Sequence, residues 1–255
     1  MKNKFTILGC GSSLGTPWIT NYNGKLNNNK KNIRTRCCAH VKVGDFSILI
    51  DTSPDIKNQI LKNKIRNVDA IFYTHEHADQ TTGIFEMRPF FWKNKKRIPV
   101  YGSNRTINAL KKSHTYCFKS RHGYKPIMKS IVFKKNFTIK KKRTKLTIKV
   151  IDVKHGEISA NGFVIQNVAY ISDCNQIKKN SIKDLYNLKY LIIDCLKYEK
   201  HPSHFNLDDA LALIKLVKPK KTILTNLHVD LDYGKLKKIL PNNVEPAFDG
   251  LNFNF

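Results

Sequence analysis

Short runs of apolar, β-branched and aromatic residues recur along the chain between polar segments, and this pattern predicts strands. The strands are expected at Phe5–Gly9, Ala39–Val43, Ser47–Asp51, Ala70–Tyr73, Pro99–Tyr101, Leu146–Val153, Phe163–Ile165, Ala169–Ser172, Tyr190–Asp194 and Thr222–Thr225. Many of these runs are apolar at successive positions, which is typical of strands that are covered on both faces of their sheet.

Apolar residues at helical spacing predict helices between the strands. In the helix expected at Leu207–Val217, Ala210 and Ile214 share one face, and Asn206 can cap the first turn. Further helices are expected at Pro54–Lys62, Arg105–Lys112 and Tyr233–Ile239. Strands that alternate with helices over 255 residues predict one layered α/β domain, residues 1–255.

The composition indicates which class of protein this domain belongs to. A 41% share of apolar residues is enough to form a core. No apolar run reaches the roughly 18 residues that a membrane span needs, and the strand at Phe5 leaves no room for a signal peptide before it. The six cysteines form no C-x-x-C pair and lie in or beside strands, so they are expected to be reduced core thiols in a cytoplasmic protein. The one alternative is Cys174, which follows Asp173 and could serve as a metal ligand.

The formal net charge of +27 has two interpretations. Lysine runs at 93–97 and 134–143 are candidate patches for nucleic acid or phosphate. Lysine, asparagine and isoleucine are all abundant, however, and a genome rich in A and T would produce that composition without any such role. Under either interpretation the field of the protein attracts anionic substrates.

The most informative segment follows the predicted strand that ends at Tyr73. His75, His77 and Asp79 stand at alternate positions there, and in a tight loop just past a strand end alternate side chains can converge on one point. Imidazole nitrogens and a carboxylate suit zinc, manganese or iron. The alternative is a chance pair of surface histidines.

Other strands end in polar residues of the same kind. Asp51, His155 and Asp173 each follow an apolar run, and Thr225-Asn226 closes the last predicted strand. Polar groups at strand ends of a layered α/β fold are expected to build one site, so these residues favour a metal centre over a chance pair of histidines.

These segments, in this order, resemble the metallo-β-lactamase superfamily of metal-dependent hydrolases. Its pattern is an aspartate after an early strand, then H-x-H-x-D-H, a distant histidine, a bridging aspartate and a last histidine. The branch that contains the phosphoribosyl 1,2-cyclic phosphate phosphodiesterases is similar to this chain in narrower motifs, and the tRNA 3′-processing endonucleases are related to it. Those motifs are LGCGSSLGTP at 8–17, DTSPD at 51–55, HPSHF at 201–205, DLDY at 230–233 and FDGL at 248–251.

The resemblance implies a four-layer αββα sandwich with a metal site at one edge. It implies that a first ion, Zn²⁺ or Mn²⁺, is held by His75, His77, His155 and Asp173. Asp79 is a ligand if a second ion binds, and a base or a water-orienting group if none does.

The resemblance also assigns roles outside the ligand set. Asp51 is expected to be a buried carboxylate that holds the histidine loop, and His204 to be the general acid. His201 has no matching position and is expected to be a surface or supporting residue.

Two positions depart from the family pattern. Gln80 stands where the family has the last histidine of H-x-H-x-D-H, and Asn226 stands where it has the final metal histidine. Both histidines serve the second ion in the family. An amide oxygen is an uncharged and weak ligand for zinc, so the second ion is expected to be weak or absent. His228 could act as a substitute, but residues two apart on an extended chain are displaced by about 7 Å.

The expected function is hydrolysis of a small anionic phosphodiester, cyclic ones included, such as phosphoribosyl 1,2-cyclic phosphate. An RNA-processing nuclease is the first alternative, supported by charge and kinship, although no insertion matches the long arm with which those endonucleases grip tRNA. A relative that has lost most activity, with Gln80 and Asn226 marking the loss, is the second. A homodimer is left open, and no membrane partner is expected.

Overall fold

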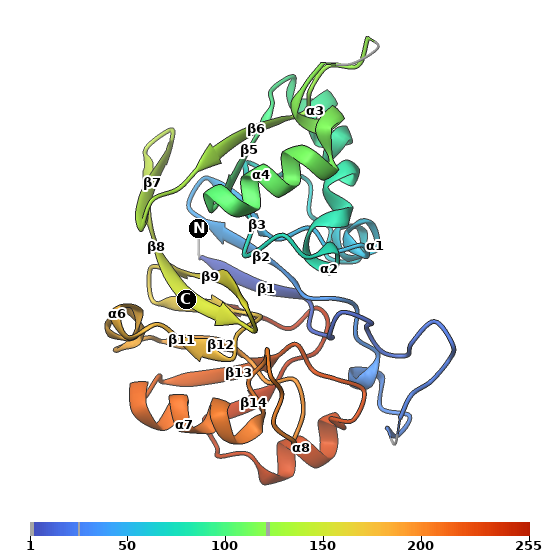
Figure 1. Ribbon diagram of the computed structural model, residues 1–255, viewed down its shortest axis with the longest axis vertical. Helices are drawn as coiled ribbons and strands as arrows, with labels where there is room; N and C mark the ends of the chain where they lie inside the picture. Colours follow the sequence, from blue (N-terminus) through green and yellow to red (C-terminus); the bar gives the residue numbers. More distant parts are fainter. Residues whose placement is uncertain (1–2, 25, 121–122) are drawn as a thin grey trace.

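A computed structural model describes residues 3–24, 26–120 and 123–255. Two sheets pack face to face in the middle of the molecule, and helices cover their outer faces (Figure 1). This arrangement is the four-layer αββα sandwich that the sequence predicted.

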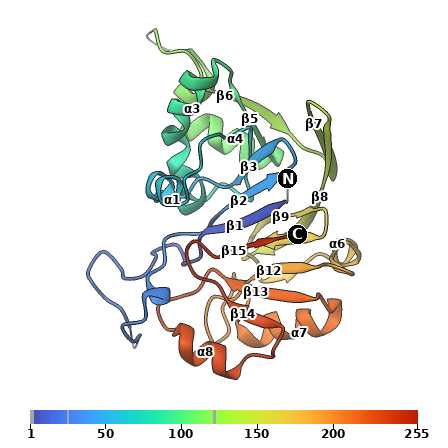
Figure 2. The ribbon, with the colours of Figure 1, turned by 180° about the vertical axis from the view of Figure 1, so that it is seen from behind.

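The first sheet has the strand order β15-β1-β2-β3-β4-β5-β6. Its strands are β1 (Lys4–Gly9), β2 (Cys38–Val43), β3 (Phe46–Ile50), β4 (Ala70–Phe72), β5 (Ile98–Gly102), β6 (Met128–Val132) and β15 (Asn252–Asn254). The strands from β3 to β6 run parallel, so their carboxyl ends point to one edge of the sheet. The C-terminal strand β15 pairs with β1 and forms one edge of this sheet (Figure 2).

The second sheet has the order β11-β8-β9-β10-β12-β13-β14, and β7 pairs with β8. Its strands are β7 (Asn136–Lys141), β8 (Thr144–His155), β9 (Ile158–Ile165), β10 (Val168–Ile171), β11 (Gln176–Ile177), β12 (Tyr190–Asp194), β13 (Lys221–Thr225) and β14 (Val244–Pro246). The strands β10, β12, β13 and β14 are parallel to one another. Their carboxyl ends therefore also share an edge.

The helices divide between the two outer layers. Those packed with the first sheet are α1 (Ile56–Lys62), α2 (Ala78–Thr81), η2 (Thr82–Met87), α3 (Arg88–Asn94), α4 (Asn104–Ser113) and α5 (Thr115–Phe118). Those packed with the second are α6 (Lys179–Ile182), η3 (Lys183–Leu185), α7 (Leu207–Val217) and α8 (Tyr233–Ile239), while η1 (Lys30–Asn32) lies in the long loop after β1. Among the described helices, none is both long and apolar enough to cross a membrane.

Three apolar clusters separate the four layers. The middle one joins the inner faces of the sheets, for example Phe5 and Ile48 with Phe163 and Ile192. One outer cluster packs the first sheet under α1 and α4, and the other packs the second sheet under α7. All six cysteines are buried and free, which confirms the prediction of reduced core thiols.

The helices predicted at 207–217 and 233–239 have the same first and last residues as α7 and α8. The strands predicted at 146–153 and 163–165 are shorter than β8 and β9. β8 extends from Thr144 to His155 and β9 starts at Ile158, not at Phe163. The extra length arises because the two strands pair up to the tight turn at Gly156, whose φ is +60°. The histidine at 155 is consequently the last residue of a strand, not part of a loop.

Candidate metal centre

The candidate site lies where the carboxyl ends of strands from both sheets meet. From the first sheet, His75 follows β4, and His77 is the residue just before α2. From the second sheet, His155 ends β8 and Asp173 follows β10. Asp79 lies within the short helix α2, not in the tight loop that the sequence predicted. Residues that are up to about a hundred positions apart in sequence are thereby brought to one edge of the sandwich.

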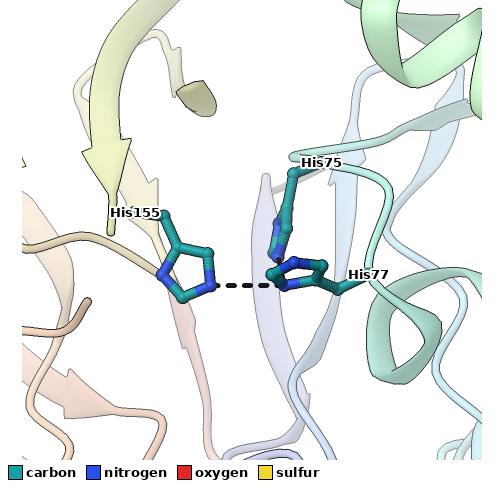
Figure 3. A group of neighbouring side chains, drawn as sticks. All are labelled: His75, His77 and His155. Atoms are coloured by element: carbon teal, nitrogen blue, oxygen red, sulfur yellow. Dashed lines mark hydrogen bonds between the residues drawn. The ribbon is translucent and has the colours of Figure 1, made fainter. Parts of the chain in front are cut away.

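Three imidazole rings face one another at this edge (Figure 3). Nδ1 of His77 lies 3.0 Å from Nε2 of His75 and 3.3 Å from Nε2 of His155. Two nitrogens bound to one tetrahedral zinc at about 2.0–2.1 Å would lie roughly 3.3 Å apart. The spacing of the three nitrogens therefore already suits one divalent ion.

The outer nitrogens of two of these rings are fixed by hydrogen bonds. Nδ1 of His155 lies 2.8 Å from the carbonyl oxygen of Ser203, which can only accept, so this nitrogen carries the proton. The hydroxyl of Thr74 donates to Asp51 at 2.9 Å and is thus free to accept from Nδ1 of His75 at 3.0 Å. In both rings Nε2 is left with a lone pair that faces the centre, as a metal ligand requires.

Asp51 holds the loop that carries the histidines through its contacts with Thr74. It is fully buried, and its carboxylate accepts hydrogen bonds from both the backbone N–H and the hydroxyl of Thr74, at 2.8 and 2.9 Å. Its φ of +64° places the backbone in the left-handed region. Burial raises the pKa of Asp51 well above its usual value, and the two hydrogen bonds from Thr74 partly oppose that shift. A backbone strained in this way persists where surrounding contacts hold it, often beside a functional site.

A carboxylate lies in a second cluster that shares His155 with the first. Ligand atoms of His155, Asp173 and His204 lie within 4.8 Å of one another, as do those of His75, His77 and His155. Burial opposes ionisation of Asp173, but the neighbouring imidazoles of His75, His204 and His155 outweigh it and lower its pKa. Within the described parts of the chain these are the two clusters with ligand geometry, and Cys174 and His228 belong to neither. The donors fit a borderline ion such as zinc or manganese.

Gln80 and Asn226, the two positions that depart from the pattern expected from the sequence, both donate hydrogen bonds to Asp173. Nε2 of Gln80 donates to one carboxylate oxygen and Nδ2 of Asn226 to the other, each at 3.3 Å. The same Nε2 lies 3.2 Å from the carboxylate of Asp79. Burial and the charge of Asp173 raise the pKa of Asp79 to about 6. Hydrogen-bond donors thus face the carboxylates of both Asp173 and Asp79.

His204 is paired with Asp194, and the sequence analysis identified only His204. Its Nδ1 lies 2.8 Å from the carboxylate of Asp194, a fully buried residue at the end of β12. Burial alone would lower the pKa of His204, but the carboxylates of Asp194 and Asp173 outweigh it and raise the pKa to about 9. Asp194 was not singled out from the sequence, although it ends a predicted strand as Asp51 does, and that signal could have found it.

A cavity of about 400 Å³ opens above these residues. It is lined by Ser12, Ser13, Leu14, His77, Asp79, His155, Asp173, Leu196, Lys197, His201, Ser203, His204, Asn226 and His228. His201, expected to be a surface or supporting residue, thus lines the wall of the cavity. His228 lines it as well, while its Nδ1 is held 2.7 Å from Asp230 and not directed into the ligand set.

A sequence profile and solved structures both match this chain. A sequence profile described as "Beta-lactamase superfamily domain" matches residues 47–226. The crystal structure of a diphosphatase from the PhnP family is similar to this chain with a TM-score of 0.90 and 29% identity, over 100% of this chain and 98% of the other. The short form of human tRNase Z has a TM-score of 0.70 at 16% identity, with 98% of each chain covered, and this likeness shows the fold alone.

One curated relative differs in name. It is an octanoyltransferase of Porphyromonas gingivalis (strain ATCC BAA-308 / W83), which is 28% identical to this chain over 252 residues. The match covers 96% of this chain but 50% of that protein, so the chain spans about half the length of the curated relative that it matches.

Proposed function

Because the chain belongs to the β-lactamase superfamily and is a metal-dependent hydrolase of that fold, we propose that it hydrolyses small anionic phosphodiesters. Residues 1–255 would form its single hydrolase domain. The observation that carries the proposal is that ligand atoms of His75, His77 and His155 lie within 4.8 Å of one another, and those of His155, Asp173 and His204 likewise, beside a cavity that His77, His155 and Asp173 line. The similarity to a diphosphatase of the PhnP family supports phosphate chemistry, and a cyclic phosphodiester such as phosphoribosyl 1,2-cyclic phosphate is the substrate we favour.

We infer that these four residues hold one ion, Zn²⁺ or Mn²⁺. When bound, such an ion activates water at neutral pH and stabilises negative charge on the phosphate. Asp79 then orients or deprotonates the attacking water, or becomes a ligand if a second ion binds. Asp51 keeps the histidine loop in place through Thr74.

The proton for the leaving oxygen would come from His204. Its Nδ1 is engaged by Asp194, so Nε2 is the nitrogen that can serve the cavity. An ionised Asp194 favours the imidazolium form, which is the form that can donate. As the bond between phosphorus and the leaving oxygen breaks, that oxygen takes the proton of Nε2 and becomes a neutral hydroxyl, which in a cyclic diester stays on the sugar.

The Gln80 and Asn226 amides argue for a site with one ion in place of a decayed site with two. In a decayed site the buried Asp173 would lose its partner, whereas here both of its oxygens accept a hydrogen bond. We do not extend the octanoyl transfer of the longer relative to this chain, because burial raises the pKa of thiols such as Cys10, Cys37 and Cys174 and leaves no reactive nucleophile among them.

The test is a screen of the purified chain on cyclic phosphates, bis-aryl phosphates and RNA, before and after chelation. We expect turnover of small phosphodiesters that is lost on chelation and restored by Zn²⁺ or Mn²⁺. His77→Ala should abolish it, while His114→Ala, at a half-buried histidine outside the cavity, should retain it. Turnover of RNA alone, with a steep dependence of binding on salt, would instead support the nuclease.

A further inference from the structure

Two adjoining cavities lie at the edge of the first sheet that is opposite the candidate metal centre. They have volumes of about 400 and 490 Å³ and share the lining residues Phe46, Asn67 and Asp69. Phe46 begins β3 and Asp69 precedes β4, so the cavities lie at the amino ends of these strands, whereas Asp51 and His75 follow the carboxyl ends. Of the residues that the structure describes, none that lines these two cavities also lines the cavity beside the metal centre.

Basic side chains outnumber acidic ones in the lining of both cavities. The acidic residues are Asp45 and Asp69. Among the described residues, Asp69 pairs with Lys141 at 2.7 Å, and no other basic side chain of the lining forms an ion pair. We call the basic lining residues the basic groove: Lys4, Lys42, Lys64, Arg66, Lys96, Arg97, Lys140 and Lys141.

A histidine in the wall of the larger cavity responds to this charge. Burial lowers the pKa of His40 to about 4, and the nearby charges of Lys42 and Lys4 act in the same direction. His40 is therefore neutral near pH 7, and the positive charge of the groove comes from its lysines and arginines.

The first of the two lysine runs noted in the sequence, 93–97, is fixed against the floor of the groove. Nζ of Lys93 donates to the carbonyl oxygen of Arg66 at 2.9 Å. Nδ2 of Asn94 donates to the side-chain oxygen of Asn67 at 2.8 Å. The start of the run is thus held by the segment before β4, and the end of the run lines the smaller cavity.

The second run, 134–143, reaches the same cavity from the other sheet. It contains β7, and Nζ of Lys141 donates to the carbonyl oxygen of Asp45 at 2.9 Å. Lys140 of this run and Lys96 of the first run therefore line one cavity, although they are far apart in sequence. Figure 1 shows β7 and α2, which carries Asp79, on opposite sides of the molecule.

The shape of the groove fits a chain of phosphates better than a single phosphate. Cations that are spread over two adjoining hollows can each contact a successive phosphate and release its counterions. Tyr101 also lines the smaller cavity, and its ring is held by stacking on Phe137 with centroids 4.9 Å apart. A basic groove that contains an aromatic ring is typical of sites for single strands, because their bases have faces that are free to stack.

We propose that the basic groove binds single-stranded nucleic acid through its phosphates, at a site separate from the metal centre. Lys96, Arg97 and Lys140 contact the strand in one cavity, and Lys4 and Lys42 contact it in the other. The strand is held at the groove and is not hydrolysed there. The inference goes beyond the proposed function and does not depend on it, because the two sites lie at opposite edges of the first sheet.

The experiment measures binding of a fluorescent oligouridylate of about 12 nucleotides by anisotropy, over a series of salt concentrations. The groove variant is Lys96→Gln with Lys140→Gln, which removes one exposed charge from each run. The control is Lys215→Gln with Lys238→Gln, at exposed positions in the last turns of α7 and α8. Both double variants have the same net charge, so the comparison separates the groove from the overall charge of the protein.

We expect the groove variant to weaken binding about tenfold at low salt, and the control variant to bind as the wild type does. The slope of log K against log salt should fall by about 1.4 in the groove variant, since each phosphate contact with a single strand contributes about 0.7. Equal weakening in the two double variants would overturn the proposal, because overall charge would then explain binding. A duplex of the same length that binds more tightly than the single strand would also contradict it.

Two further measurements keep this proposal distinct from the proposed function. His77→Ala should bind the oligouridylate as tightly as the wild type, and loss of binding in that variant would place the strand at the metal centre instead. The groove variant should hydrolyse small phosphodiesters at the wild-type rate. Absence of hydrolysis in the wild type would refute the proposed function and leave the binding result to decide the groove.

Discussion

Replacing Asp194 by Asn should convert His204 from a good proton donor into a poor one at alkaline pH. The carboxylate of Asp194 lies 2.8 Å from Nδ1 of His204 and is fully buried, so its charge acts on the ring with little screening. Burial raises the pKa of Asp194 itself to about 6, which leaves it ionised above neutral pH. Asparagine preserves the shape of the side chain and removes that charge.

The size of the effect follows from the pKa of His204. With Asp194 ionised, this pKa is raised to about 9, and without the carboxylate it should fall toward 6.5. At pH 8 a group with a pKa of 9 is about 90% protonated and one with a pKa of 6.5 is about 3% protonated. A reaction that needs the imidazolium should therefore slow by about 30-fold at pH 8 and by less than twofold at pH 6.

The assay is a profile of kcat against pH on a sugar or nucleotide phosphodiester, whose alkoxide needs a proton to leave. We expect the alkaline limb to move to lower pH in Asp194→Asn, because the acid form is lost as pH rises through its pKa. Asp209→Asn, at an aspartate in α7 outside the cavity, should leave the limb in place. An unchanged alkaline limb in Asp194→Asn, together with a uniform loss at all pH values, would refute the role of this pair.

Three further outcomes follow from the same contacts. Gln80→His and Asn226→His should each have little effect alone, and together should raise the affinity for a second ion in calorimetric titration; two single changes that sum to the double change would show that the positions do not share an ion. His204→Ala should cost about 10²–10⁴-fold on a sugar or nucleotide phosphodiester and little on 4-nitrophenyl esters, with metal content unchanged, and equal losses on both would remove His204 from proton transfer. Asp51→Asn should weaken metal retention by about 10–100-fold in competition with a chelator, because Thr74 loses the carboxylate that orients His75, while unaltered retention would limit Asp51 to a structural role.

Much of the fold could be predicted from local signals. The helix at Leu207–Val217 has a regular apolar face, a capping Asn206 and a stop before Pro219, and the structure reproduces its limits. The β7 strand escaped prediction because Asn136–Lys141 is mostly polar and acquires its conformation from pairing with β8. The short β14 and β15 were missed for a different reason, because strands of three residues carry too few positions to show a pattern.

Some features of the candidate site could also be predicted from the sequence, and others could not. Residues that follow strong strands, such as Asp51, His75 and Asp173, could be placed from the sequence because strand ends converge in an α/β fold. The hydrogen bond from Asn226 to Asp173 could not, because it depends on two strands whose spacing only the folded sheet defines. The lining of the cavity likewise joins segments near Ser12 and Lys197 that are distant along the chain.

The central claim, a centre built for one ion, is tested most directly by counting metal. Protein purified without added metal and dialysed against a weak chelator should retain one divalent ion per chain by elemental analysis. The ion should be lost in His77→Ala and retained in His114→Ala. Two tightly held ions per chain in the wild type would contradict the account, because Gln80 and Asn226 would then support a second ion in place of hydrogen bonds to Asp173.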